Sequence, residues 1–444
     1  MQPRLRRGES VLSKGSPVQQ LLLAVFVAAA YVALASISAA VAYSPADAWT
    51  VWLPSGVVFG LLLSLQRARW PVILAGGWVG ATIFAVGLGS GPLASAGYGF
   101  IEVIACGAAA FFVSRLTTLP ARLDSARELV AIILGGALPL ALIGAGMATF
   151  WHVADGGSTG ATTFEIWALS NFLGTLLVAP MVIAWSGMRA KRSGGMPMPV
   201  FVAGAVVAVL FLGVMWLLFD RPVEKRIFGS AGPTLTYIPI VFMALVGLLW
   251  GTRGATAVAF IGALIAMVNT AQGEGPFAGV PGFTGDPELE VEAYALAIGL
   301  TGLLIAVLAA AQRNAVRAAR EWKTRFEATI GAHRLLAYDW DPASGRFVVT
   351  GDSVQLLGRT PVQLSTLADW LAMVAPEDRE RVTAHFDTRA RGALDDDVLY
   401  YTLTGADGQV VKATDDARPI RDHEGSLHRI AGIVRTATTA RSVA

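Results

Sequence analysis

Long runs of apolar residues alternate with short polar segments between residues 18 and 312, and the pattern then changes to that of a soluble chain. A helix that crosses about 30 Å of hydrocarbon needs about 20 predominantly apolar residues. The runs predict ten membrane segments, at 18–43, 50–66, 70–89, 92–116, 127–151, 164–188, 198–219, 235–250, 253–271 and 288–312. The second and the eighth are short enough to be re-entrant. Residues 18–312 are therefore expected to form a polytopic α-helical membrane bundle.

Helical periodicity continues beyond the last apolar run. Apolar residues recur three or four positions apart, with charged residues between them, at Ala315, Ala319, Trp322, Phe326 and Ile330. This spacing predicts an amphipathic linker helix over 313–331. A short parallel coiled coil between two copies and a simple connector both fit a helix of this length.

From residue 332 the pattern becomes that of a small α+β domain. Two strands are predicted at 336–341 and 346–350, and three more at 399–404, 410–417 and 427–436. Helical patterning fills 352–391, where Pro376 followed by acidic residues is typical of a helix start. A five-stranded antiparallel sheet with short helices is expected over 332–437, followed by a tail at 438–444.

Composition agrees with a membrane half followed by a soluble half, and the distribution of charged residues predicts the orientation of the chain in the membrane. Hydrophobic residues make up 54% of the chain and charged residues 15%. About eighteen Lys and Arg residues lie in the tail 1–17, in loops after even-numbered segments and after segment ten, against three in the opposite loops. Cationic loops stay in the cytoplasm, so both termini are predicted to be cytoplasmic. The sequence has no basic patch with interleaved aromatic residues, so a nucleic-acid partner is not expected.

The second apolar segment contains helix-breaking residues. Pro54 and Gly56 interrupt the hydrogen-bond ladder of a helix, which lipid tolerates only where protein or a cavity satisfies the freed groups. With Trp52 and Ser55 beside them, these residues are a candidate cavity wall. The alternative is a proline kink packed against small neighbours.

Glu102 is the deepest ionisable residue of the predicted bundle. A carboxylate in the bilayer costs several kcal/mol unless it is paired or neutralised. One interpretation is a ligand, ion or proton site; the other is a protonated side chain that hydrogen-bonds a neighbouring helix through Asn171 or Asn269. His152 is interpreted as an interfacial group, and the single cysteine, Cys106, as a small packing residue.

Three motifs occur in order along the membrane half. The first is Trp52-Leu53-Pro54-Ser55-Gly56, followed by Arg67-Ala68-Arg69-Trp70-Pro71 and Gly76; the second is Glu102 followed by small residues and Arg115; the third is Trp167-Ala168-Leu169-Ser170-Asn171-Phe172-Leu173-Gly174, followed by Val178-Ala179-Pro180 and Trp185.

Together these motifs resemble the MASE1 family of bacterial membrane-associated sensor domains. The family is usually drawn with about eight spans, usually has an acidic residue where Asn171 stands, and often has Asn where Gly99 stands. With the motifs, the resemblance implies a ligand-binding role for Trp52, Pro54, Ser55, Gly56, Glu102, Trp167 and Asn171. No metal ligand or catalytic residue is predicted.

The soluble half resembles a PAS domain of the subclass with a Pro-Glu-Asp-Arg motif, which stands here at 376–379. Supporting pieces are Asp339-Trp340-Asp341, Leu356-Leu357-Gly358, Ala406-Asp407-Gly408 and Arg418-Pro419-Ile420. The resemblance implies a domain that binds flavin, haem or a small ligand, or none. The domain lacks the Cys of a photoactive flavin type, and His385 is more typical of a packed or exposed helix residue than of a haem ligand. We expect no cofactor.

No kinase, cyclase or hydrolase signature occurs in the 444 residues, so the chain is predicted not to be an enzyme. The main hypothesis is a bacterial inner-membrane sensor that detects a membrane or periplasmic cue and biases a cytoplasmic PAS homodimer. Its output would pass through a separate partner, such as a histidine kinase or diguanylate cyclase, or through a further C-terminal module. The alternatives are a transporter with a regulatory PAS tail and a PAS-dimerised membrane scaffold.

Overall fold

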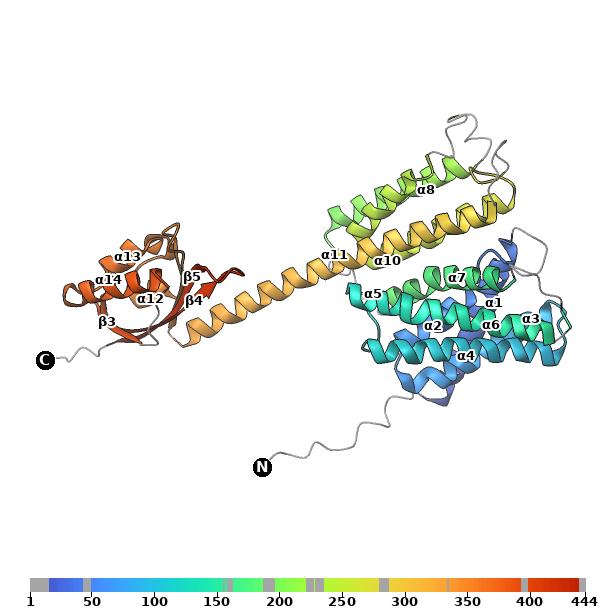
Figure 1. Ribbon diagram of the computed structural model, residues 1–444, viewed down its shortest axis with the longest axis horizontal. Coiled ribbons are helices and arrows are strands. Elements are labelled where there is room, and N and C mark those ends of the chain that lie inside the picture. Colours follow the sequence, from blue (N-terminus) through green and yellow to red (C-terminus); the bar gives the residue numbers. More distant parts are fainter. Residues whose placement is uncertain are drawn as a thin grey trace, which may run out of the picture. The chain divides into compact units, whose positions relative to one another are not determined.

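The chain divides into two compact units, Met1–Asn314 and Ala315–Ala444. Figure 1 labels their helices and strands along the ribbon. The computed structural model describes residues 16–42, 49–154, 156–157, 163–186, 196–220, 227, 235–278, 287–333, 335–392 and 398–438. Most of the predicted tail 1–17, the end of the tail 438–444, and the charged loops at 187–195 and 221–226 lie outside the described residues.

The first unit is a bundle of helices. In chain order these are α1 (Pro17–Ala40), α2 (Pro54–Ser64), the short η1 (Arg67–Arg69), α3 (Trp70–Gly87), α4 (Pro92–Leu116), α5 (Ala126–Ile132), the π-helical η2 (Ile133–Ala137), α6 (Leu138–Ala154), α7 (Thr163–Ser186), α8 (Met198–Phe219), α10 (Ile238–Ala271) and α11 (Pro287–Ala332). Among the described residues, 8 helices are long and apolar enough to cross a membrane. The predicted polytopic membrane bundle is confirmed.

Helix α10 covers two predicted segments and reverses direction between them. Gly251 has φ 67° and ψ −156°, outside the helical region, and a positive φ favours glycine. A Cβ placed on Gly247 would lie 3.6 Å from the Cβ of Ala255, whereas residues eight apart in a straight helix are separated by about 12 Å along its axis. The 8 long helices, one of them folded in two, and the 11-residue α2 therefore account for the ten predicted segments.

Side-chain hydrogen bonds tie several helix ends together at one end of the bundle. They join the last turn of α7, the start of α8, the turn at Gly251 and the part of α11 near Arg313: Arg253 Nε donates to Ala184 O (2.9 Å), Trp250 Nε1 to Phe201 O (3.1 Å) and Arg313 Nη1 to Leu248 O (3.2 Å). These are the ends that the loop charges assign to one side of the membrane.

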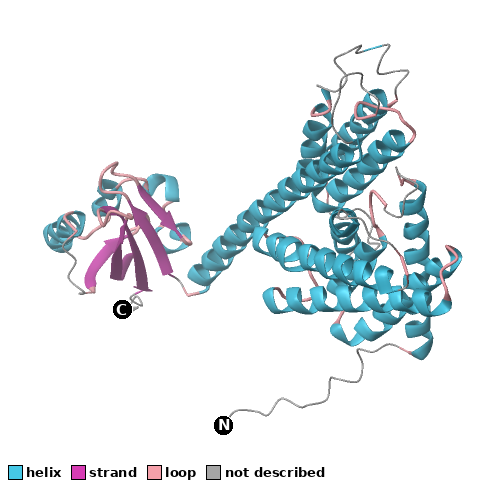
Figure 2. Cartoon of the chain, turned by 45° about the vertical axis from the view of Figure 1, so that its right-hand side comes forward, coloured by secondary structure: helices cyan, strands magenta, loops and turns pink. Residues whose placement is uncertain are grey.

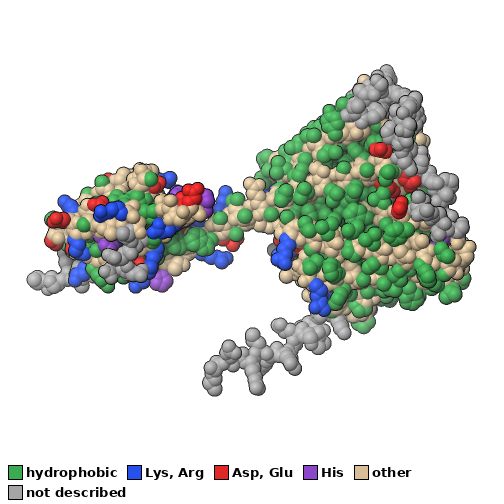
Figure 3. All heavy atoms as spheres, viewed as in Figure 1, with side chains coloured by type: hydrophobic (Ala, Val, Ile, Leu, Met, Phe, Trp, Pro, Cys, Tyr) green, Lys and Arg blue, Asp and Glu red, His purple; other side chains and the backbone are tan. Residues whose placement is uncertain are grey.

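Large apolar side chains cover the outside of the bundle, as the space-filling view shows (Figure 3). The exposed ones include Leu21, Leu22, Val25 and Phe26 on α1, Phe100, Phe111 and Phe112 on α4, and Phe201, Val206 and Val209 on α8. A soluble protein rarely exposes so continuous an apolar surface, and a lipid bilayer is the solvent that matches it.

The second unit contains a five-stranded antiparallel sheet with short helices packed against it (Figure 2). The strands are β1 (Leu335–Trp340), β2 (Phe347–Thr350), β3 (Leu399–Thr404), β4 (Val410–Arg421) and β5 (Leu427–Thr438), in the order β2-β1-β5-β4-β3. The helices are α12 (Ser353–Leu357), η4 (Pro361–Leu364), α13 (Leu367–Ala372) and α14 (Pro376–Ala390). The predicted sheet and the predicted helix start at Pro376 are confirmed.

Large aromatic side chains fill the space between this sheet and its helices. Trp370 and Phe386 come from the helices and Tyr338 and Phe347 from the strands, and all four are buried. The Tyr338 and Phe347 rings stack with centroids 4.8 Å apart. His385, on α14 beside Phe386, is half-buried.

A buried ion pair crosses the same core. Arg389 Nη1 of α14 lies 3.1 Å from Asp415 Oδ1 of β4, and both side chains are at most 2% exposed. Asp415 also accepts hydrogen bonds from the hydroxyls of Tyr338 and Tyr401. Burial raises the pKa of the Asp415 carboxyl, whereas the Arg389 guanidinium beside it acts in the opposite direction. The core therefore depends on both charges being present together.

Arg389→Ala is expected to lower the free energy of unfolding of the 315–444 unit by roughly 3–5 kcal/mol, because Asp415 is left buried without its cation. Urea denaturation of the isolated unit, followed by tryptophan fluorescence, measures this. The exposed neighbour Arg391 supplies the control: Arg391→Ala should change the free energy by less than about 0.5 kcal/mol. Equal effects of the two substitutions would contradict a structural role for the pair.

Candidate functional site

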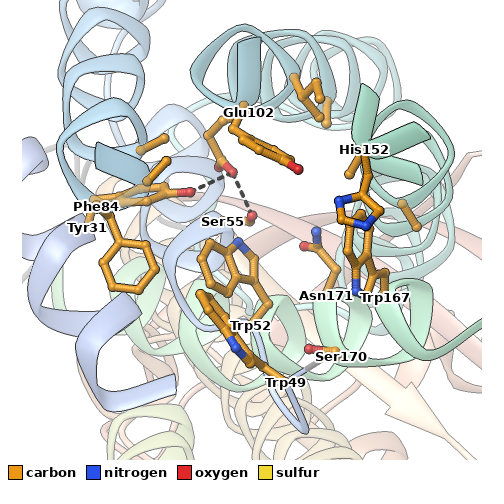
Figure 4. Close-up of a pocket in the computed structure, with 18 of the residues that line it drawn as sticks. Tyr31, Trp49, Trp52, Ser55, Phe84, Glu102, His152, Trp167, Ser170 and Asn171 are labelled. Carbon is orange, nitrogen blue, oxygen red and sulfur yellow. Dashed lines mark hydrogen bonds between the residues drawn. The ribbon is translucent and has the colours of Figure 1, made fainter. Parts of the chain in front are cut away.

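A cavity of about 560 Å³ lies inside the membrane unit, between helices α1, α2, α3, α4, α6 and α7 (Figure 4). This volume is typical of small-molecule sites. The lining residues are Tyr31, Trp49, Trp52, Ser55, Ala81, Phe84, Ala85, Leu88, Ser90, Tyr98, Ile101, Glu102, Ala105, Gly144, Ala145, Ala148, His152, Trp167, Ser170 and Asn171. They include one carboxylate, one histidine and no Lys or Arg.

Non-helical residues ahead of α2 form one wall of this cavity. Pro54 is the first residue of α2, so it starts a helix and does not kink one, as a proline at this position can because its missing N–H is not needed there. The backbone before it finds partners in neighbouring helices: Trp52 N donates to Ser170 O (2.9 Å) and Leu53 N to Ser38 Oγ (3.1 Å). Protein groups thus satisfy the irregular backbone, as a membrane interior requires.

Two glycines bring this wall against α7. A Cβ on Gly56 would lie 2.7 Å from the Cβ of Val178, and a Cβ on Gly174 would overlap the carbonyl group of Trp52. Small residues permit such close approach of helices in membranes. Pro54 and Gly56 do not line the cavity, and their contribution is to position Trp52 and Ser55, which do.

Glu102 lies at the centre of a hydrogen-bonded cluster. Its Oε2 accepts from Ser55 Oγ (2.9 Å) and Tyr31 Oη (3.2 Å), and its Oε1 accepts from Cys106 Sγ (2.9 Å). The side chain is 7% exposed and points into the bundle towards Ser55 (Figure 4). Its partners are Ser55, Tyr31 and Cys106, and not the predicted Asn171 or Asn269. Asn269, one of the two predicted partners, donates instead to Ile265 O (2.7 Å).

The cluster around Glu102 holds no cation. No Lys, Arg or His forms an ion pair with Glu102 in the described part of the chain. Three neutral donors disperse negative charge on a carboxylate but do not neutralise it. The charge balance of the cavity must therefore come from a proton or from a bound species.

Aromatic rings form much of the remaining wall. Trp52 stacks on Trp49 with centroids 4.5 Å apart, and Phe84 meets Trp49 edge-on at 5.3 Å. On the α6–α7 side, His152 meets Trp167 edge-on at 5.8 Å. The cavity therefore combines one acidic group with large aromatic surfaces.

Asn171 contributes a polar group to the α7 side of the cavity. Its Oδ1 is buried and has no hydrogen-bond partner among the described residues. Figure 4 shows its amide facing the space between Trp52 and His152. An acceptor left without a donor in a dry site costs free energy, so a ligand that donates to it would be favoured.

One contact connects the cavity wall to the last membrane helix. Thr50, the residue after Trp49, is 1% exposed, and its Oγ1 donates to Glu288 Oε1 (3.2 Å) near the start of α11. Helix α11 then continues without interruption for 46 residues to Ala332. The predicted linker helix is thus the same helix as the last membrane segment.

Five of the seven predicted site residues line this one cavity: Trp52, Ser55, Glu102, Trp167 and Asn171. Sequence reasoning missed Tyr31, Trp49 and Tyr98. Trp49 and Tyr98 lie near span ends, where aromatic residues are commonly interfacial, and Tyr31 is in the middle of α1 with no motif around it. Sequence reasoning interpreted His152 as an interfacial group. In the structure His152 is in the last turn of α6, and its side chain also lines the cavity. Cys106, interpreted as a packing residue, also donates to Glu102. Its spacing of four from Glu102, on one helix face, was the available signal.

A multi-pass bundle around an acidic cavity and a soluble α+β unit are the parts of a membrane-bound sensory protein. Residues 21–314 match the MASE1 family, which is more than half of the chain, so this protein belongs to the MASE1 family. Residues 347–434 match the PAS fold. The combination gives the protein a role in sensing and signal transduction.

Three solved structures resemble part of the chain. One is the N-terminal domain of a diguanylate cyclase with a PAS/PAC sensor from Marinobacter aquaeolei, with 22% identity over 22% of this chain and 92% of that one, at a TM-score of 0.21. A sensory box histidine kinase/response regulator from Burkholderia thailandensis E264 has 18% identity over 26% and 85%, at 0.22. A domain of a putative light and redox sensing histidine kinase from Haloarcula marismortui has 20% identity over 26% and 99%, at 0.21. No curated protein matches the chain.

Gly174→Ala is expected to lower the melting temperature of the detergent-purified protein by about 3–10 °C, because the new methyl group overlaps the Trp52 carbonyl and forces a backbone shift. Gly107 on α4 is the matched control, since a Cβ there would lie 3.7 Å from the nearest atom, on Leu74. Gly107→Ala should leave the melting temperature unchanged. If the two variants melt alike, the close approach of α7 to the cavity wall is not as described.

Proposed function

We propose that this protein is a bacterial inner-membrane receptor. A small molecule enters the cavity from the periplasmic side, and its binding changes the state of α11 and of a cytoplasmic PAS domain. The observation that carries this proposal is the cavity itself: a buried carboxylate without a counter-ion, in a wall hydrogen-bonded to the helix that leads to the PAS unit.

The orientation follows from the loop charges and supports entry from the periplasm. Cation-rich segments stay in the cytoplasm, which puts both termini there. The periplasmic side then carries Trp49 between α1 and α2, Leu88 and Ser90 between α3 and α4, and His152 in the last turn of α6. Glu102 is ten residues beyond Pro92, about 15 Å into α4. The cavity would thus lead from the periplasmic surface to roughly the middle of the membrane.

Transmission would use α11 as a rigid element. Binding against Trp49 and Trp52 moves the segment that carries Thr50, and the hydrogen bond from Thr50 to Glu288 passes that movement to the start of α11. A continuous helix conserves rotation or displacement that a flexible linker would dissipate. The ligand needs only a difference of a few kcal/mol between its affinities for the two states to shift them.

The linker part of α11 is suited to a homodimer. Trp322 is 67% exposed, and its ring stacks on Phe326 with centroids 5.3 Å apart. Charged pairs such as Lys323–Glu327 accompany this apolar stripe. A parallel two-stranded contact with a second copy would bury the stripe. The output would then pass to a separate histidine kinase or diguanylate cyclase, or to a further module.

A transporter is the second candidate function, and one feature favours it. Helix α2 starts inside an apolar segment beside the cavity, and interrupted helices beside a central site are typical of transporters. Uptake of a cavity ligand into proteoliposomes would favour this function. Binding without uptake would favour the receptor.

Glu102→Gln is expected to hold the receptor in one signalling state. The variant lacks the charge with which a ligand would pair, so ligand binding could no longer shift the receptor between its two states. The measurement uses a chimera in which a diguanylate cyclase catalytic domain follows residue 438 and cyclic dinucleotide is the readout. We expect the output of this variant to stay at one level whatever the growth medium, at unchanged membrane abundance. Glu165→Gln, at an exposed position on α7, should behave as wild type. A normally responsive Glu102→Gln chimera would refute the proposal.

A further inference from the structure

We propose that the cavity binds a compact organic cation that carries N–H donors, such as a protonated amine or a guanidine. This inference rests on the proposed function, in which the cavity is the ligand site, and it specifies the chemical class of the ligand. Three independent features of the wall support it: charge, aromatic surface and an unused acceptor.

An ionised Glu102 gives the wall a negative charge that a positively charged ligand would balance. Glu102 is the only carboxylate among the lining residues, and these residues contain no Lys or Arg. The donors on its two oxygens, Tyr31, Ser55 and Cys106, are all neutral groups. A cationic ligand would pair with this carboxylate away from bulk water, where such a pairing is stronger than at a surface. An anionic ligand would meet a buried negative charge.

The aromatic surface favours an organic cation over a metal ion. Tyr31, Trp49, Trp52, Phe84, Tyr98 and Trp167 all line the cavity. Tryptophan and tyrosine faces attract ammonium and guanidinium groups, most strongly when water is excluded. Within the described ranges, no group of three or more His, Cys, Asp or Glu side chains could hold a metal ion. The walls therefore supply rings for a cation and lack the ligand set of a metal.

The unused acceptor favours N–H donors over a quaternary ammonium. Asn171 Oδ1 is buried without a hydrogen-bond partner among the described residues, and its amide faces the cavity (Figure 4). A protonated amine has several N–H groups and could donate to Asn171 as well as to Glu102, whereas a tetraalkylammonium has none. The other titratable groups of the wall are Tyr31, Tyr98 and His152, and His152 lies across the cavity from Glu102 (Figure 4).

Binding of n-butylammonium chloride to the full chain in lipid nanodiscs tests the class. The melting temperature is followed against concentration at constant ionic strength. Pentan-1-ol is the neutral probe of similar shape, and tetramethylammonium chloride is the quaternary probe. We expect saturable stabilisation by n-butylammonium, at least about tenfold weaker binding of tetramethylammonium, and none by pentan-1-ol. Equal effects of n-butylammonium and pentan-1-ol would overturn the proposal, because the site would then read shape and not charge.

Three variants locate the effect. Glu102→Gln should weaken n-butylammonium binding at least about tenfold, since truncating one partner of a buried charge pair is costly. Asn171→Asp adds a second negative charge to the wall and should tighten binding, which provides a test even if Glu102→Gln does not fold. Glu128→Gln is the control: this buried carboxylate accepts from the backbone N–H groups of Arg122 and Asp124, outside the cavity. Glu128→Gln should bind n-butylammonium with the affinity of the wild type. Unchanged affinity for n-butylammonium in both Glu102→Gln and Asn171→Asp would overturn the assignment of the ligand to this cavity.

The failure of this inference and that of the receptor proposal are distinguishable. If n-butylammonium binds through Glu102 but Glu102→Gln leaves the chimera responsive, the cation site stands and the receptor proposal fails. If no cation binds while Glu102→Gln locks the chimera, the receptor proposal stands and the ligand class proposed here is wrong.

Discussion

The membrane unit is organised around one carboxylate that has three hydrogen-bond donors and, among the described residues, no paired cation. Glu102 accepts from helices α1, α2 and α4 through Tyr31, Ser55 and Cys106. A buried charge in lipid persists only where the fold supplies partners or water. Helix α2 starts at Pro54, so Ser55 in its first turn lies beside Glu102, and the non-helical Trp52 and Leu53 N–H groups find partners on neighbouring helices. The cavity is the space that this arrangement leaves open.

The same arrangement gives the cavity a mechanical connection. The segment that bears Trp49 and Trp52 is held on one side by Gly174, where any larger residue would collide with it, and on the other by the hydrogen bond from Thr50 to α11. In the proposed mechanism, a ligand that binds against the two tryptophans acts on this segment. Helix α11 runs from Pro287 to Ala332 and includes both the last membrane segment and the predicted linker.

The sequence was sufficient to predict the architecture. Apolar runs long enough to cross a membrane and the alternation of strands both extend over many residues, so no single residue decides them. The sequence also singled out Glu102 and the segment around Pro54 and Gly56 as candidates, because ionisable and helix-breaking residues are expensive in lipid and so stand out. It did not identify Tyr31, Trp49 or His152. Their residue types are common at membrane interfaces. They reach the cavity through the packing of α1 against α2 and α3, the packing of α6 against α4 and α7, and the position of the segment before α2 that carries Trp49. The reversal of chain direction at Gly251 corresponds to the two-residue gap between the predicted segments 235–250 and 253–271. The conformation of one glycine decides how tight that turn is, and the sequence pattern does not specify it.

The central claim is that the charge on Glu102 controls the state of α11. Hydrogen–deuterium exchange of the full chain in nanodiscs tests this directly, by comparing wild type with Glu102→Gln over residues 315–332 and with Glu165→Gln as the reference for a harmless change. The account predicts that exchange in 315–332 changes several-fold in Glu102→Gln and stays at the wild-type rate in Glu165→Gln, since local opening reports the stability of a helical segment. Identical exchange in all three proteins would mean that the cavity and the linker helix are not coupled.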